Sequence, residues 1–326
     1  MRLASISVDL DEIPNYFEIH GLAPPDGPAA SLVYDVAISR LRALADAGGF
    51  PLTLFAIGSD LARDEASRGL REASAAGHEI ANHTLDHRYD LVRLGRAEIT
   101  KQVEEGARAI ERAVGQRPVG FRAPGYTITD EVFDVLAELE VAYDASVFPC
   151  PAYFAAKTAA IGAIAVRGRK SRSIVDSPTV LLAPTQPYRV GKPYWRRGAG
   201  LLEIPVQVTR GLRLPFIGTS VTLAGPSRAR WLAKMCIGDP LVNLELHGMD
   251  VLDAADGLEA LRPYQHDVHQ RLIQGSGEVA EAGDALPVPQ RLAQRPSQRQ
   301  RNVLVRVVVI DPRVALRIHH HVEEPV

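Results

Sequence analysis

Two aspartates near the start of the chain have the type and spacing needed for metal chemistry. Asp9 and Asp11 lie two residues apart at the end of residues 5–8, where serine and an aliphatic residue alternate. Such alternation predicts a β-strand, so both carboxylates should leave the same face near its C-terminal end. Two carboxylates this close repel each other unless a cation separates their roles or one of them takes a proton. One could therefore bind a metal while the other stays ionised as a proton acceptor.

Three histidines complete the set. His83 and His87 are four residues apart, which is one helical turn if that segment is helical, and His247 follows Leu244-Glu245-Leu246. Two imidazoles and one carboxylate make a three-ligand metal site with open positions, leaving the second aspartate as a base and the third histidine as an acid. These are the groups that metal-assisted hydrolysis needs. Either motif alone is more often structural, because strand-end aspartates usually cap turns and surface histidines are usually solvated.

Taken together, the motifs resemble those of the polysaccharide deacetylases of the NodB-homology type, also called carbohydrate esterase family four. In one subgroup the two aspartates of the first motif are separated by one residue, as Asp9 and Asp11 are. The second motif, His-Ser/Thr-x-x-His, matches residues 83–87. The remaining motifs match, in order, Arg122-Ala123-Pro124, Tyr143-Asp144-Ala145-Ser146 and Leu244-Glu245-Leu246-His247, so the resemblance runs from the first strand to about residue 262.

The resemblance implies both a fold and a reaction. The fold is α/β, a distorted parallel (β/α) barrel that is usually seven-stranded. The reaction is hydrolysis of an N-acetyl group, or of an O-acetyl or formyl group, on a sugar or glycoconjugate. Because the leaving group of an amide needs a proton more than that of an ester does, a dedicated acid favours N-deacetylation.

The resemblance also assigns roles to individual residues. The ligands of a divalent metal are Asp11, His83 and His87, and their nitrogen and oxygen atoms favour Zn²⁺. The base is Asp9, oriented by Arg122; the acid is His247, kept cationic by Asp144; and the N–H of Gly125 faces the oxyanion. The sequence departs from the family twice. Gly125 stands where many relatives have Tyr, and the fourth motif lacks their Trp.

Composition is that of an ordinary enzyme. The 326 residues are 46% hydrophobic with a net charge of -2, which gives no reason to expect a nucleic-acid partner. Two cysteines far apart give no disulfide framework, which favours a reducing compartment. The first expected strand leaves no room for a signal peptide, and no apolar run is long enough to cross a membrane, so we expect a cytoplasmic protein. Nothing in the sequence indicates an oligomeric state.

Strand and helix patterns alternate along the first half of the chain. Apolar periodicity predicts helices over residues 33–47, 65–76 and 97–114, and a helix that begins at residues 129–131. Short apolar runs predict strands at residues 51–57, 119–121 and 141–143. This alternation, with polar residues at the strand ends, is typical of a parallel α/β barrel.

The second half divides differently. We expect a catalytic domain over residues 1–264 with a loop-rich insertion at about 150–225, and an atypical tail over 265–326 that is poorly packed from about residue 275, with residues 303–310 at best an edge strand. A change of reading frame would also explain the tail. The insertion is either loop padding or a sugar-binding segment whose aromatic rings, together with Tyr126, stack on the substrate. The candidate rings in the insertion are Tyr188, Tyr194 and Trp195.

Two other functions remain open at this point. An aspartate-nucleophile phosphatase would also use Asp9 and Asp11, but it expects Thr or Val where this chain has Ile13, and it leaves His83 and His87 unexplained. A catalytically inactive sugar-binding barrel would share the fold and the motifs. Metal content and amine release from an N-acetylated sugar would separate these possibilities.

Overall fold

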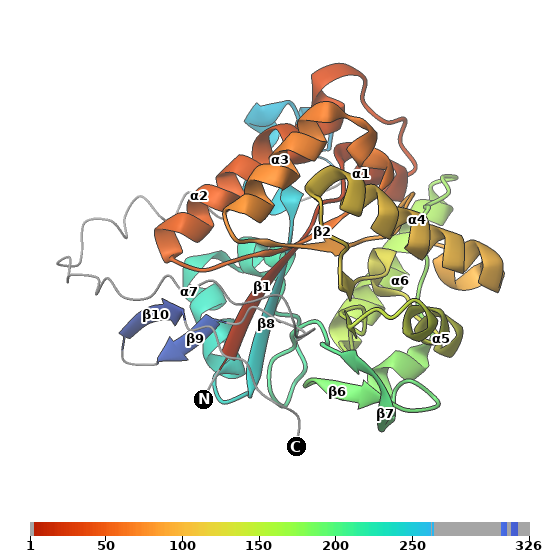
Figure 1. Cartoon of the computed structure of the whole chain (residues 1–326), viewed down its shortest axis with the longest axis vertical. Coiled ribbons are helices and arrows are strands. Elements are labelled where there is room, and N and C mark those ends of the chain that lie inside the picture. The colour runs from red at the N-terminus through yellow and green to blue at the C-terminus, as the bar shows by residue number, and fades with distance from the viewer. Residues whose placement is uncertain (1–2, 262, 264–307, 312–313, 319–326) are drawn as a thin grey trace.

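The chain forms a curled, mostly parallel β-sheet covered by helices. The computed structural model describes residues 3–261, 263, 308–311 and 314–318. The strands are β1 (Leu3–Asp9), β2 (Thr53–Ala56), β3 (Glu79–Asn82), β4 (Gly120–Phe121), β5 (Tyr143–Asp144), β6 (Tyr188–Val190), β7 (Arg197–Glu203), β8 (Leu241–His247), β9 (Val308–Asp311) and β10 (Val314–Ile318). Their order is β10-β9-β1-β2-β3-β4-β5-β7-β6, with β8 also paired to β1 (Figure 1). This is the half-barrel form of the distorted α/β barrel that the sequence predicts.

The strand number differs from the expected seven. Between residues 3 and 261 the described chain has eight strands, because β6 pairs antiparallel with β7 at the edge of the parallel sheet. Pairing is parallel from β8 through β1, β2, β3, β4 and β5 to β7. The parallel part therefore contains seven strands, and a hairpin adds the eighth.

Helices follow the strands much as the apolar periodicity indicates. They are α1 (Ile13–Ile19), α2 (Ile38–Gly48), α3 (Asp64–Ala75), α4 (Arg96–Val114), α5 (Asp130–Glu138), α6 (Pro151–Val166) and α7 (Gly218–Cys236). The predicted helix at 97–114 is confirmed as α4, closed by Gly115 at φ 77°. The Thr129 side chain accepts a hydrogen bond from the Val132 N–H and so caps α5. The helix expected over 33–47 begins as a π-helical turn, Val33–Ala37, and continues as α2.

Two large apolar clusters hold the sheet and helices together. One lies between β1, β2 and the helices α2 and α3, where Leu41, Leu54 and Leu70 are fully buried. The other packs α4 and α5 against β4 and includes Phe121 and Leu136. Burying one such leucine or phenylalanine stabilises the fold by roughly 1.5–3 kcal/mol. Together these clusters fix the strand ends on which the site residues lie.

The region expected to be a loop-rich insertion contains regular structure. Residues 150–225 include α6, the β6–β7 hairpin and the first part of α7. Most of α6 is exposed, and Ile164 is its one buried residue. Its alanine-rich sequence therefore lacks the amphipathic period by which a helix is recognised.

The prediction that residues after about 275 are poorly packed can be compared with the structure only in part. Residues 275–307 lie outside the described residues, and so does most of the predicted strand at 303–310. Its last residues coincide with β9, which pairs antiparallel with β1 at Ala4↔Val308 and Leu3↔Val309. None of the helices in the described part of the chain combines the length and the apolar character needed to cross a membrane.

Candidate active site

The predicted site residues gather at the C-terminal ends of neighbouring parallel strands. Asp9 and His247 are the last residues of β1 and β8, and they are paired in the register of these two strands, which run side by side in Figure 1. His83 directly follows β3, and Arg122 directly follows β4. Parallel strands converge at this edge, which is where α/β proteins place their sites.

Three buried ligand atoms converge on one point. Asp11 Oδ1 lies 3.2 Å from His83 Nε2 and 3.2 Å from His87 Nε2. Within the described residues, none of these three atoms has a hydrogen-bond partner. Burial raises the pKa of Asp11, but the two imidazoles outweigh it and hold that pKa well below its ordinary value. Asp11 is therefore an ionised carboxylate facing two ring nitrogens.

The hydrogen bond that each imidazole makes through Nδ1 determines the tautomer of its neutral ring. His83 Nδ1 lies 2.7 Å from the Arg122 carbonyl oxygen, and His87 Nδ1 lies 3.1 Å from Asn15 Oδ1. Both oxygens only accept, so each Nδ1 carries the proton and each Nε2 presents its lone pair. A carboxylate and two imidazole nitrogens that meet at one point attract a cation, so these residues fit the divalent ion that the motifs imply.

The segment that carries the two histidines is a loop and not the helical turn that their spacing would also allow. Thr84 and His87 have φ values of 71° and 49°, outside the helical range. Asn82 Oδ1 accepts from the Thr84 N–H at 3.0 Å, and Thr84 Oγ1 accepts from the His87 N–H at 3.1 Å. These side chains satisfy backbone groups that a helix would have paired internally. The histidines still meet, because the loop folds back on itself.

Gly106 lets α4 approach this loop closely. A Cβ atom at Gly106 would lie 2.6 Å from Asn82 Oδ1 and 2.7 Å from the Thr84 carbonyl carbon. We expect Gly106→Ala to lower stability and weaken metal binding, although alanine normally stabilises a helix interior by roughly 1 kcal/mol. Thermal unfolding and metal titration check this. Gly162→Ala in α6 is the matched control, because its Cβ would meet nothing within 4 Å; equal effects of the two changes would contradict the prediction.

Arg122 holds the proposed base, Asp9. Its Nη1 donates to Asp9 Oδ1 at 2.5 Å, its Nη2 to Ser7 Oγ at 2.8 Å and its Nε to the Ala145 carbonyl at 2.8 Å. The guanidinium carbon lies 4.1 Å from the centre of the Phe55 ring, and the side chain is fully buried. A cation fixed in this way orients one oxygen of Asp9 and balances its negative charge. The other oxygen, Oδ2, lies 3.9 Å from His83 Nε2, beside the metal-ligand atoms.

His247 is paired with a carboxylate other than the expected one. Its Nδ1 lies 3.1 Å from Glu245 Oε1, and its Nε2 lies 3.4 Å from the Tyr126 hydroxyl. Burial lowers the pKa of His247, but the charges of Glu245 and of the aspartates outweigh it and raise that pKa to about 9. Glu245 itself is completely buried. A protonated imidazole held against a buried carboxylate can act as an acid.

The expected partner, Asp144, is engaged elsewhere. Its two oxygens accept from the N–H and Oγ of Ser146 at 3.0 and 2.7 Å, and Ser146 Oγ in turn accepts from the Ala123 N–H. Asp144 thus fixes the segment that follows Arg122. The carboxylate that pairs with His247 is Glu245 and not Asp144. The sequence carried the signal, because Glu245 stands two residues before His247 on the same face of β8.

Gly125 occupies a position that a larger residue would strain. It has φ 62°, and a Cβ there would lie 3.0 Å from Tyr89 Cδ1. Tyr126 is also left-handed, at φ 58°, an uncommon conformation for a residue other than glycine. This backbone directs the Tyr126 ring toward His247, with ring centres 6.3 Å apart. The assignment of the Gly125 N–H to an oxyanion stays a prediction.

Two of the three candidate aromatic residues of the insertion are buried. Tyr188 and Tyr194 are buried in the second apolar cluster, and the Tyr188 hydroxyl donates to the Tyr194 carbonyl at 2.9 Å. The Tyr194 ring packs 5.6 Å from Phe133 and 5.2 Å from Trp195. Burial does not fit the sugar-stacking role predicted for Tyr188 and Tyr194, because residue type alone does not distinguish a buried ring from an exposed one, whereas the role of the partly buried Trp195 stays a prediction. Tyr126 is the aromatic candidate that reaches the site.

Comparisons with known proteins agree with this geometry. Residues 26–143 match the family model for polysaccharide deacetylase. Over this segment, a little more than a third of the chain, the sequence is therefore similar to a polysaccharide deacetylase domain. Over 93 residues it is 39% identical to a chitooligosaccharide deacetylase from Sinorhizobium fredii and 38% identical to one from Bradyrhizobium. The matched segment is 28% of this chain and covers 42% and 41% of those relatives, so it spans well under half of their length.

Three solved structures are similar to part or most of this chain. A candidate polysaccharide deacetylase from Mycobacterium smegmatis aligns with 90% of this chain and 94% of its own, at 21% identity and a TM-score of 0.49. A family 4 carbohydrate esterase from Streptomyces lividans covers 44% of this chain and 60% of its own, at 22% identity and a TM-score of 0.33. A pseudoenzyme of the family from Bacillus anthracis covers 55% and 57%, at 15% identity and a TM-score of 0.35.

Proposed function

We propose that this polysaccharide deacetylase domain is a metal-dependent hydrolase that removes an N-acetyl group from a sugar or glycoconjugate. The observation that carries the proposal is the convergence of three buried ligand atoms, on Asp11, His83 and His87, beside a carboxylate fixed by an arginine and an imidazole paired with a carboxylate. The two curated relatives are chitooligosaccharide deacetylases, which supports an N-acetylated sugar as the substrate.

The ligand set fits a divalent ion, and its two nitrogens and one carboxylate oxygen favour Zn²⁺. When bound, the ion would supply Lewis-acid polarisation of the acyl carbonyl and a water of lowered pKa. The protein's own part is to hold Asp11 ionised and to present both Nε2 lone pairs. The Arg122 carbonyl and Asn15 do this by fixing the two Nδ1 protons.

Asp9 is the base in this mechanism. Arg122 occupies its Oδ1, so Oδ2 is the oxygen that takes the proton from the attacking water. Asp9 is almost completely buried, and its hydrogen-bond partner is a fixed cation. The groups around Asp9 therefore need not reorganise when the proton moves. The Gly125 N–H is the proposed donor to the developing oxyanion.

His247 is the acid in this mechanism. Glu245 holds Nδ1, so the proton on Nε2 faces the site and passes to the leaving sugar nitrogen as the carbon–nitrogen bond breaks. The Tyr126 hydroxyl beside Nε2 orients this proton. An amide needs this step and an ester needs it less, which supports N-deacetylation over O-deacetylation.

The proposed catalytic domain is residues 1–264, with residues 265–326 outside it. Both cysteines, Cys150 and Cys236, are buried and free, which supports a reducing compartment.

A single preparation of the full chain tests the function. The metal content of the purified protein is measured together with the release of acetate and free amine from N-acetylglucosamine conjugates. A stoichiometric ion with equal release of both products supports the deacetylase. Sugar binding without release would indicate the inactive barrel, and release of phosphate from p-nitrophenyl phosphate would indicate the phosphatase.

The pairing of His247 with Glu245 predicts the alkaline limit of activity. His247 donates only while protonated, so hydrolysis of an N-acetyl substrate should persist up to about pH 9 and fall as the pH rises through that value. Glu245→Gln removes the negative charge that raises the pKa of His247. We therefore expect the alkaline limb of kcat/KM to move about 1–2 pH units toward acid.

A pH profile of each variant measures this shift. Glu203→Gln is the matched control, because Glu203 is equally buried at the end of β7 but accepts a hydrogen bond from the Val147 N–H at 3.0 Å instead. An unchanged limb in Glu245→Gln, or the same shift in both variants, would show that Glu245 does not set the pKa of His247.

A further inference from the structure

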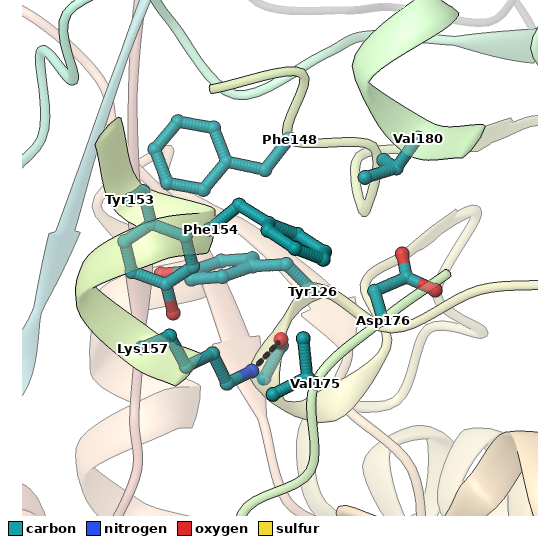
Figure 2. A pocket seen from close by; sticks show the side chains of 9 residues that line it. Tyr126, Phe148, Tyr153, Phe154, Lys157, Val175, Asp176 and Val180 are labelled. Carbon is teal, nitrogen blue, oxygen red and sulfur yellow. Dashed lines mark hydrogen bonds between the residues drawn. The ribbon is translucent and has the colours of Figure 1, made fainter. Parts of the chain in front are cut away.

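A small cavity lies beside Tyr126, whose hydroxyl contacts His247. Its volume is about 20 Å³, enough for one water molecule or one hydroxyl group. Figure 2 shows the aromatic rings and two charged side chains around it. The residues that bear on the argument are Tyr126, Phe148, Phe154, Lys157 and Asp176. Lys157 comes from α6 and Asp176 from the segment after it, both within the region that the sequence predicts to be a loop-rich insertion.

One wall of the cavity carries a donor. Lys157 Nζ donates to the Gly125 carbonyl at 2.8 Å, the contact drawn as a dashed line in Figure 2. An ammonium has three protons, so further donors remain after this bond. Burial lowers the pKa of Lys157 to about 8, with Asp176 acting in the opposite direction.

The opposite wall carries an acceptor. Asp176 Oδ1 accepts from the Ser177 N–H at 2.6 Å, whereas Oδ2 is buried and has no hydrogen-bond partner among the described residues. A buried carboxylate oxygen left in this state costs free energy unless a ligand or water donates to it. A group that donates a hydrogen bond to Asp176 Oδ2 would therefore stabilise this cavity.

The cavity is also correctly placed relative to the proposed acid. Tyr126 forms one of its walls, and the hydroxyl of the same residue lies 3.4 Å from His247 Nε2. Because His247 protonates the leaving sugar nitrogen, the sugar ring must lie on the His247 and Tyr126 side of the site. A substituent of that ring is the nearest part of a substrate to the cavity.

We propose that this cavity is a specificity subsite for one hydroxyl group of the sugar that carries the acyl group. The hydroxyl donates to Asp176 Oδ2 and accepts from Lys157 Nζ, while Tyr126, Phe148 and Phe154 form the apolar part of the cavity wall. A purely apolar group would leave Asp176 unpaired. A phosphate or carboxylate is too large for the space and would be repelled by Asp176. This inference rests on the proposed function for the position of the sugar.

Binding tests the subsite separately from hydrolysis. The zinc-loaded Asp9→Asn protein, which keeps the site but lacks the base, is titrated calorimetrically with N,N′-diacetylchitobiose and its monodeoxy analogues. We expect Asp176→Asn, added to Asp9→Asn, to weaken binding of the parent sugar by about 10- to 100-fold, as for loss of a hydrogen bond to a charged group. One deoxy analogue should bind as weakly to the Asp9→Asn protein, and Asp176→Asn should not weaken it further.

The analogues and a control variant decide the outcome. Asp134→Asn makes the same change on α5, where Asp134 forms an ion pair with Lys192, and should leave binding unchanged. If Asp176→Asn binds every sugar as tightly as its parent protein, the subsite is overturned even when the enzyme releases acetate. If binding depends on Asp176 but no acetate is released by the enzyme with Asp9 intact, the subsite stands and the proposed hydrolysis fails. If no sugar in the series binds, the subsite is overturned for N-acetylglucosamine sugars.

Discussion

The His83→Ala protein is expected to lose both its divalent ion and its hydrolytic activity. His83 supplies one of three ligand atoms, and Asp11 Oδ1 with His87 Nε2 cannot enclose an ion alone. Metal analysis of the purified variant should find no stoichiometric ion, and acetate release should fall to the background rate. A His83→Ala protein with a full complement of metal and full activity would rule out this ligand assignment.

Thermal unfolding separates ligand loss from misfolding in this variant. An ion that binds only the folded chain raises stability by about 2.7 kcal/mol at 100 times its dissociation constant. Added zinc should therefore raise the melting temperature of the metal-free native protein and leave that of His83→Ala unchanged. His20→Ala, a histidine change at the end of α1, is the control and should keep the zinc response.

The positions of the site residues could be predicted because strand ends are readable from sequence. Alternating apolar residues locate the end of β1 at Asp9, whereas His247, at the end of β8, was assigned from the Leu-Glu-Leu-His motif. Parallel pairing then places these ends side by side, and in the structure Asp9 and His247 are register partners. The charge partner of His247 could also have been predicted, because side chains two residues apart on a strand lie on the same face, as Glu245 and His247 do.

Other features could not be predicted, for physical reasons. A spacing of four residues fits a helical turn and equally a loop that folds back, and the side-chain bonds of Asn82 and Thr84 favour the loop. The helix α6 has too few polar residues to show an amphipathic period. Whether Tyr194 faces a sugar or packs on Phe133 depends on tertiary neighbours that a local sequence does not specify.

Asp9→Asn should separate metal binding from catalysis. Asparagine has the shape of aspartate and can still accept from Arg122 through Oδ1, so the arginine stays paired and the fold is retained. The side chain loses its capacity to take a proton, so we expect kcat on an N-acetyl substrate to fall about 10²- to 10⁴-fold. Zinc content should remain stoichiometric, because Asp11, His83 and His87 are unchanged. Metal analysis and acetate release on one preparation measure both quantities.

The alternative for Asp9 is a metal ligand, and the geometry separates the two roles. Asp9 Oδ2 lies 3.9 Å from His83 Nε2, whereas Asp11 Oδ1 lies 3.2 Å from the same atom. Arg122 also neutralises Asp9, which weakens it as a ligand and leaves Asp11 as the carboxylate available to the cation. If Asp9→Asn loses its zinc together with its activity, Asp9 is a ligand and the base must be another group. Asp35→Asn, a change in an exposed ion pair with Arg63, should alter neither quantity.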